Sequence, residues 1–418
     1  MSCIERFDGE EKQPSPSATS PPPDGGVAAW TQAALMHLVF FNTWGVTNGF
    51  GVFQEYYSNT LGQSPSAISW IGSVQVFLLF LVGVVAGRAS DAGHFRVIFA
   101  LGVLLQLLGI FMTSLCTTYW QIFLAQAVCM GLGNGLTFTT SLSVVSSYFS
   151  EKRAIAVGIG AAGSGTGSLV YPTIIDQLLN RGKLGFPATI RIMGLVMLAT
   201  YIPCLLFFRQ RLPPRKSGRL VEISALREMP FVFFTLGQFF NFWGLYFAFF
   251  YIGTFARDRI GVSQPIKLVI LLNGVGIIGR VVPNIIADRK TGMLNLIIPL
   301  SFSSSILVFC WAGIHSETGL YVFTILYGFI AAALQSLYPA AATTMSPQPD
   351  RTGSRVGLIF SIVSFATLTG PAICGALIEQ GDGMYLHAQI FSGLSIFLGG
   401  CMAVAARVTK AGLIWMKI

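Results

Sequence analysis

The sequence predicts an all-α integral membrane protein in which twelve transmembrane helices form two six-helix bundles. The amino-acid composition and the length of the apolar blocks together predict this fold class. Of the 418 residues, 53% are hydrophobic and only 10% are charged, whereas soluble proteins carry roughly 25% charged residues. The apolar residues also gather in blocks of about 20, the length of helix that crosses a bilayer. The chain therefore lacks the charges that would cover a soluble protein of this length.

The apolar blocks form two sets of six with a polar loop between them. The first set is 29–52, 67–88, 95–116, 119–146, 154–178 and 187–208, and the second set is 231–254, 266–287, 294–313, 320–345, 354–379 and 386–407. Each block is long enough to span as a helix. The predicted units are a tail (1–26), a first bundle (27–208), a linker (209–230), a second bundle (231–408) and a second tail (409–418).

The tails and loops predict the orientation. The N-terminal tail is polar and rich in Pro and Ser, which predicts a disordered segment rather than a signal peptide. Far more of the 26 Lys and Arg residues fall in the segments on the side of the N-terminus than in those on the other side. The positive-inside rule then places both termini in the cytoplasm. We expect the cell membrane, with the vacuolar membrane as the alternative. The same rule explains the net charge of +9 without nucleic-acid binding.

Cysteine and histidine usage excludes several classes of site. Six of the seven Cys lie in apolar blocks, and the four His are scattered, without the spacing of metal ligands. Such cysteines are expected to pack as small buried hydrophobic residues. The sequence therefore predicts no metal, no cofactor and no membrane-embedded enzyme, which would need a catalytic cluster.

Two loops in equivalent places suggest that the halves are related. Gly87, Asp91 and Arg96 lie in the loop between helices 2 and 3, and Ala287-Asp288-Arg289-Lys290 lies in its counterpart between helices 8 and 9. Matching loops are typical of transporters built from repeats. The first loop resembles that of the major facilitator superfamily, although it is one residue shorter than the commonest form.

Further motifs resemble the monocarboxylate porter family in its fungal branch. They are Pro23-Asp24-Gly25-Gly26 with Trp30, Ser66 to Ile71, Tyr148 to Ala154, Arg211 to Arg215, and Gly279-Arg280 with Pro283 and Ala287 to Arg289. The resemblance implies alternating access and a central cavity lined by helices 1, 4, 7 and 10. Two departures matter. Asn48 stands where proton-coupled members have a Lys, and Gly276 stands where they have an Asp, so lactate-type proton symport is not expected.

Arg280 is the sharpest candidate for a binding residue. It lies inside an apolar block, where a charge costs at least about 2.5–3.5 kcal/mol. A guanidinium can hold a planar anion by two parallel hydrogen bonds. The alternative is a structural Arg satisfied by helix-end carbonyls or by Asp288.

Polar and aromatic residues on the four cavity helices are the other candidates for substrate contact. They are Asn42, Trp44, Asn48, Asn134, Thr139, Asn241, Trp243, Tyr246, Gln335 and Tyr338. The alternative for each is a hydrogen bond between helices. His37 is the candidate for proton coupling, and a hydrogen bond to a neighbouring helix is again the alternative.

Asp91, Arg96, Asp288 and Arg289 are candidate gate residues. A charge network at the cytoplasmic ends of the helices would bias a two-state equilibrium. The alternative is a set of loop charges that only fixes topology.

Together these features predict a secondary active transporter that exports an organic anion or a secondary metabolite. Its partners would be a small-molecule substrate and the lipid bilayer, and we expect a functional monomer, since the GxxxG motifs serve packing within one chain. Uptake of a monocarboxylate or vitamin-like solute is the alternative. A non-transporting membrane sensor is the alternative from another class, disfavoured by the short tails.

Overall fold

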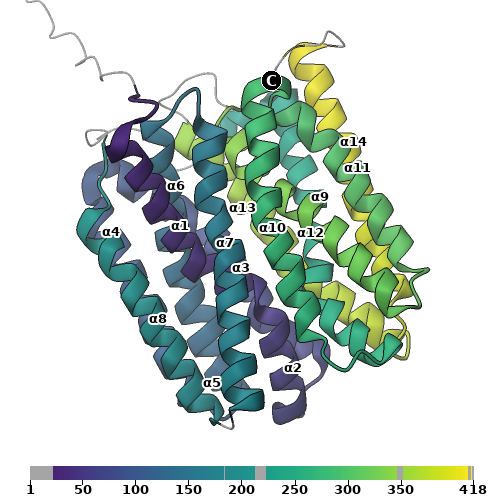
Figure 1. Ribbon diagram of the computed structural model, residues 1–418. Coiled ribbons are helices and arrows are strands. Elements are labelled where there is room, and N and C mark those ends of the chain that lie inside the picture. Colours follow the sequence, from purple (N-terminus) through teal and green to yellow (C-terminus); the bar gives the residue numbers. More distant parts are fainter. Residues whose placement is uncertain (1–21, 183, 212–222, 346–351, 413–415, 417–418) are drawn as a thin grey trace, which may run out of the picture.

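The computed structural model describes residues 22–182, 184–211, 223–345, 352–412 and 416, and all regular structure within them is helical (Figure 1). The first half contains α1 (Gly26–Asn48), α2 (Phe50–Leu61), α3 (Pro65–Ala89), α4 (Phe95–Thr113), α5 (Tyr119–Ile122), α6 (Gly131–Tyr148), α7 (Arg153–Ile175) and α8 (Phe186–Phe207). The second half contains α9 (Met229–Phe255), α10 (Ile266–Ile286), α11 (Met293–Trp311), α12 (Glu317–Ala342), α13 (Thr352–Gln380) and α14 (Leu386–Ala411).

Short helical turns extend several of these helices. They are η1 (Ser90–His94), η2 (Phe123–Met130), η3 (Asp176–Arg181), η5 (Ala256–Ile260) and η6 (Ala287–Thr291), and η4 (Ile223–Arg227) lies in the predicted linker. Residues 212–222 of that linker, residues 1–21 of the predicted N-terminal tail, and 413–415 and 417–418 of the second tail lie outside the described residues. The helices otherwise follow the predicted apolar blocks to within a few residues at their ends.

Local sequence explains where individual helices begin. Ser64 precedes α3, its hydroxyl accepts a hydrogen bond from the Ala67 backbone N–H at 3.2 Å, and Pro65 occupies the first turn. Ser316 caps α12 in the same way through the Gly319 N–H, also at 3.2 Å. Such hydroxyls satisfy N–H groups that have no partner within the helix, and proline fits a first turn that needs no donor.

The first predicted block is the one that the structure divides. α1 ends at Asn48 and α2 begins at Phe50, with a break at Gly49. A Cβ added at Gly49 would lie 3.1 Å from the Pro172 ring of α7 and 3.1 Å from the Gly45 carbonyl oxygen. Glycine therefore permits the close contact with α7 at the break.

Eleven helices in the described part of the chain are long and apolar enough to cross a membrane. α1 is not among them, because Gln32, His37, Asn42 and Asn48 dilute its apolar character. These polar residues are spread along a helix that is largely covered by protein, and its inner residues are buried. The hydropathy of α1 thus reflects packing against neighbouring helices rather than contact with lipid.

The helices pack into two groups, α1–α8 and α9–α14, which meet along two seams (Figure 1). α3 packs against α13 on one side, and α7 packs against α10 on the other. Within the first group α1 and α7 approach closely: a Cβ added at Gly163 or Gly167 would collide with the His37 or Phe41 carbonyl oxygen. The predicted role of GxxxG motifs in packing within one chain fits this contact.

Both the start of α1 and the end of α14 lie at one end of the bundle, which we call the terminal end (top of Figure 1). The opposite end, which contains α2 and α5, is called the far end. Helices that start at the terminal end, such as α1 and α9, carry their later residues towards the far end. The position of a residue within its helix therefore shows how far it lies from the terminal end and from the far end.

Candidate functional site

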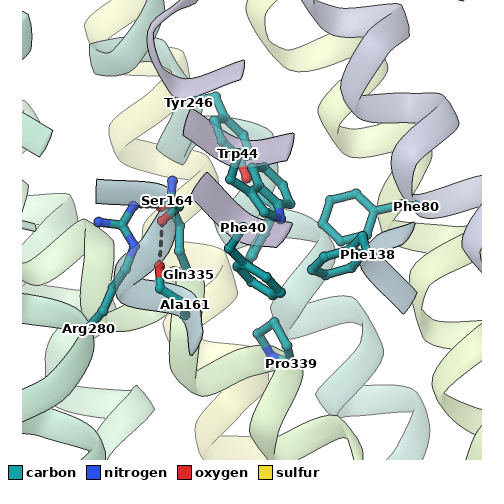
Figure 2. Close-up of a pocket in the computed structure, with 11 residues that line it drawn as sticks. Phe40, Trp44, Phe80, Phe138, Ala161, Ser164, Tyr246, Arg280, Gln335 and Pro339 are labelled. Carbon is teal, nitrogen blue, oxygen red and sulfur yellow. Dashed lines mark hydrogen bonds between the residues drawn. The ribbon is translucent and has the colours of Figure 1, made fainter. Parts of the chain in front are cut away.

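A small cavity of about 20 Å³ lies between the two halves (Figure 2). A volume of that size has room for about one water molecule, so the halves must separate before a larger solute fits. The first half lines it with Phe40, Trp44, Phe80, Phe138, Ala161 and Ser164, and the second half lines it with Phe242, Tyr246, Arg280, Gln335 and Pro339. The cavity is therefore a mostly aromatic chamber with a few polar groups.

Arg280 is the cationic residue among the described lining residues. α10 carries it inward, so that its side chain is 1% exposed. Its Nη2 donates to the Gln335 Oε1 at 2.6 Å, whereas its Nη1 has no hydrogen-bond partner among the described residues. A buried guanidinium that is held by one neutral acceptor retains an uncompensated charge, which is costly in a membrane. This position agrees with the expectation that Arg280 faces a cavity.

Two neighbouring polar groups also lack partners. The Tyr246 hydroxyl and the Gln335 Nε2 are buried, and neither has a hydrogen-bond partner among the described residues. Both residues line the cavity with Arg280. Ser164 differs, since its hydroxyl donates to the Ala161 carbonyl at 2.7 Å (dashed in Figure 2). Three donors with unused capacity thus gather in the second half, and buried donors without partners are costly unless a ligand engages them.

Aromatic rings form the rest of the chamber. Figure 2 shows Phe80 and Phe138 on the side of the cavity opposite Arg280. The Phe80 and Phe138 ring centroids are 5.8 Å apart, and Trp44 lies 5.7 Å from Phe138. Trp44 also stacks on Tyr246 of the other half, with centroids 6.2 Å apart and planes only 3° from parallel. Such walls favour a flat, partly apolar solute.

Seven predicted pocket residues do not line the cavity, because a helix presents only one stripe of its surface to it. Asn42 donates to Thr200 and accepts from Tyr171. Asn241 donates to the Tyr338 hydroxyl at 2.7 Å, and the Trp243 indole donates to Thr369 at 2.9 Å. The seven are Asn42, Asn48, Asn134, Thr139, Asn241, Trp243 and Tyr338. Their contact with substrate stays a prediction.

His37 is a residue of α1, and its half-buried side chain faces α7. Its Nδ1 is 2.9 Å from the Ile159 carbonyl oxygen, so this nitrogen carries the proton that is donated. Its Nε2 is 3.0 Å from the Thr166 hydroxyl. The ring is thereby engaged on both nitrogens with α7, away from the cavity lining. These contacts match the alternative reading of a helix-to-helix hydrogen bond, and proton coupling stays a prediction.

The predicted gate residues have different surroundings. Asp288 reaches across the seam, and its carboxylate accepts from the Ile155 backbone N–H at 2.8 Å in the first turn of α7. Arg96 and Arg289 are exposed. Asp91 lies in η1, and its side chain is outside the described residues. The contact made by Asp288 joins the two halves at the terminal end, as a gate residue would.

Two residues at the terminal end lie in motifs of the sequence analysis but were not among its candidate site residues. The Asp24 carboxylate accepts from the Ser150 and Glu151 N–H groups at 2.5 and 2.9 Å, just before α7. Arg153 starts α7, and its Nη1 lies 3.5 Å from the Thr343 hydroxyl of α12. The residue that precedes α7 is Lys152, whose side chain provides no cap. Carboxylates from two distant segments supply the acceptors that this helix start lacks.

The far end is closed by contacts between the first part of the chain and α9. Phe50 of α2 packs against Phe250 with centroids 5.3 Å apart. Beyond them Glu55 of α2 pairs with Arg257 of η5 at 3.2 Å. Together with the Trp44–Tyr246 stack, these contacts separate the cavity from the far end. Contacts between the halves are thus present at both the far end and the terminal end.

Comparisons with known proteins agree on one family. The sequence profile described as Major Facilitator Superfamily matches residues 35–371. An "MFS-type transporter" of Gibberella zeae is 44% identical over 396 residues, covering 94% of this chain and 89% of that protein. The "Aspyridones efflux protein apdF" of Emericella nidulans is 36% identical over 399 residues, covering 94% of this chain and 81% of that protein.

A solved structure supports the same fold. The human organic anion transporter MFSD10 matches with a TM-score of 0.64, covering 89% of this chain and 98% of that chain. At 16% identity this likeness speaks for the arrangement of helices alone. The chain is accordingly a multi-pass membrane protein, and from its profile match and its relatives along nearly the whole length it belongs to the Major Facilitator Superfamily.

Proposed function

We propose that this chain is a secondary active transporter that exports a secondary metabolite, with an organic anion as the favoured cargo. The observation that carries the proposal is the aromatic-walled cavity with the buried Arg280 between the two halves. The name of one relative, an aspyridones efflux protein, favours export over uptake. The motifs described above favour the fungal branch of the monocarboxylate porter family, which they resemble.

The proposed arrangement has twelve spans, with α1 and α2 together forming the first. Eleven helices qualify by their own hydropathy, and α1 is long enough at 23 residues to span most of a bilayer. With the positive-inside rule the terminal end is cytoplasmic and the far end is external. The cell membrane is the location that fits export.

Alternating access follows from two sets of contacts that cannot both persist while the halves rock. At the terminal end Asp288 holds the start of α7, and at the far end Glu55 pairs with Arg257. Opening towards the cytoplasm breaks the first contact, and opening outward breaks the second. Substrate binding in the cavity biases the equilibrium between these states. The carrier works as a monomer in this scheme, because one chain contains both halves.

The experiment is solute flux in sealed vesicles of known sidedness, with a panel from lactate to bulky aromatic acids. The wild-type protein is compared with Arg280→Ala and with a matched control, Arg259→Ala, which removes an exposed arginine. Export is supported if bulky acids move from the cytoplasmic to the external side and the flux is lost in Arg280→Ala alone. Movement of small monocarboxylates in the uptake direction would replace this proposal with the uptake alternative.

A further inference from the structure

The two seams between the halves differ at the middle of their helices. On one seam Gly165 lies near the middle of α7, and a Cβ added there would lie 2.6 Å from the Ile277 Cγ1 and 3.1 Å from the Asn273 carbonyl oxygen of α10. On the other seam Phe77 is the middle residue of α3, and its ring packs against that of Phe365 of α13, with centroids 5.4 Å apart. Backbone therefore approaches the neighbouring helix on the first seam, whereas phenylalanine rings fill the middle of the second.

The α3–α13 seam is framed by a close contact towards each end. Towards the terminal end, a Cβ added at Gly357 of α13 would lie 3.0 Å from the Val84 Cγ1 of α3. Towards the far end, a Cβ added at Gly375 of α13 would lie 3.3 Å from the Ser66 Cα of α3. At 1.5 Å per residue these two contacts are about 27 Å apart along each helix. The rings thus lie between two places where α3 and α13 come close together.

Four rings on this seam extend from the outer surface of the protein to the wall of the cavity. Phe365 is 52% exposed on a helix that is apolar enough to cross a membrane, so its ring faces lipid, and Phe77 beside it is half-buried. We call these two residues the outer pair. Phe80 and Phe360 are fully buried with centroids 5.2 Å apart, and we call them the inner pair. Both rings of the inner pair pack against Phe138, which lines the cavity together with Phe80 (Figure 2).

Side chains can open such a seam more easily than helices can. Exposed side chains change rotamer within picoseconds to nanoseconds, whereas the relative motion of packed helices takes microseconds to milliseconds. On the α7–α10 seam a solute could pass only if the two backbones separated. On the α3–α13 seam the rings can turn while the framing contacts stay in place. None of the four rings carries a charge or a hydrogen-bonding group, so an apolar solute meets no polar barrier between them.

We propose that the α3–α13 seam contains a lateral window, through which an uncharged aromatic solute dissolved in the bilayer enters the cavity. The outer pair covers the window on the lipid side, and the inner pair covers it on the cavity side. Such a solute reaches a high concentration in the bilayer, because apolar surface is driven out of water. The window concerns the route of access, and it therefore goes beyond the proposed function, which concerns the cargo and its direction.

The test uses a photoreactive probe that dissolves in the bilayer. The probe is 3-phenyl-3-(trifluoromethyl)diazirine, which is uncharged and forms a covalent bond to nearby residues when it is illuminated. The full chain is reconstituted in lipid vesicles with the probe, and labelled residues are identified by mass spectrometry. Reduced glutathione in the aqueous phase traps any probe that arrives through water. We expect Phe360 and Phe138 to be labelled, although both are buried, and we expect glutathione to leave this labelling unchanged.

A variant of the outer pair tests the route itself. Phe77→Ala removes one ring and leaves the framing contacts in place. We expect the labelling of Phe360 and Phe138 to rise about two- to tenfold, as the loss of one aromatic pair allows. Phe309→Ala is the matched control, because it removes a ring that is 39% exposed on α11, away from this seam. Labelling of Leu104, which is 61% exposed on α4, shows in each variant that the protein is folded and that the bilayer holds the same amount of probe.

Three results would overturn the window. They are an absence of label on Phe360 and Phe138 in the wild type, a loss of that label in glutathione, and equal labelling of both residues in Phe77→Ala and Phe309→Ala. The probe is uncharged and the assay needs no transport, so the result does not depend on the proposed cargo. If the buried rings are labelled and no organic acid is exported, the proposed function falls and the window stands. If acids are exported and the buried rings stay unlabelled, the window falls and the proposed function stands.

Discussion

The two walls of the cavity differ in kind. α1, α3 and α6 of the first half contribute Phe40, Trp44, Phe80 and Phe138, whereas α9, α10 and α12 of the second half contribute Tyr246, Arg280 and Gln335. The fully buried lining donors without a partner among the described residues are Tyr246 Oη, Arg280 Nη1 and Gln335 Nε2, and all three belong to the second half. The difference leads us to expect that the first half contacts the apolar body of a solute and that the second half contacts its polar group.

The largest expected effect comes from removing the charge of the second half. Arg280→Ala should lower the flux of an aromatic acid by at least about a hundredfold, as truncation of a buried charged contact does. The amount of protein at the membrane should stay near that of the wild type. Flux assays paired with surface labelling check both statements. Undiminished flux would mean that the second half does not select the polar group.

Gln335 offers a sharper test of the same wall. Gln335→Leu removes both the acceptor that holds the Arg280 Nη2 and the unpaired Nε2 donor. We expect affinity for an aromatic acid to fall about tenfold or more, while affinity for the matching neutral amide changes little. Binding isotherms for the acid and the amide measure this. An equal loss for both ligands would indicate a packing defect instead of charge recognition.

Trp44 tests the first wall. Trp44→Ala removes a ring that stacks on Tyr246 and packs against Phe138. Aromatic contacts contribute about 0.5–1.5 kcal/mol beyond buried area, so affinity should fall about three- to tenfold for acid and amide alike. This equal loss contrasts with the loss for the acid alone that is expected of Gln335→Leu. If the acid alone were affected, the division between the two walls would be wrong.

The smallest effect is expected at the far end, outside both walls. Glu55 and Arg257 pair at 3.2 Å with side chains 33% and 38% exposed, and exposed pairs contribute about 0–1 kcal/mol. Glu55→Gln should therefore shift the population open at the far end by less than about fivefold. Spin-label distances across that end measure the shift. A much larger shift would make this pair a principal gate.

The membrane helices and the importance of Arg280 could both be predicted from the sequence, for the same physical reason. Apolar blocks of membrane length and a single charge inside one of them are strong signals, because both reflect the cost of polar groups in lipid. The phenylalanines that complete the cavity carry no such signal among 34 Phe. Which of them face inward depends on how each helix is rotated in its bundle, and periodicity does not give that rotation for helices covered by protein.

The buried amides and the contacts at the terminal end show a second limit of prediction from the sequence. Asn42 and Asn241 are on cavity helices, yet each hydrogen-bonds within its own half, on a face turned from the cavity. Asp24 meets Ser150 from 126 residues away, a pairing that only tertiary structure creates. The sequence shows that Gly276 departs from the family's pattern. Only the packed structure shows how close this position lies to the Arg280 Nη1.

The central claim is that one solute engages both walls at once, with its anion at Arg280. A structure of the protein solved with bound naphthalene-2-sulfonate tests this most directly. We predict the sulfonate oxygens within hydrogen-bond distance of Arg280, Gln335 or Tyr246, and the rings against Trp44 and Phe138. Density for the probe outside the cavity, or inside it with the sulfonate turned towards the phenylalanines, would contradict the account.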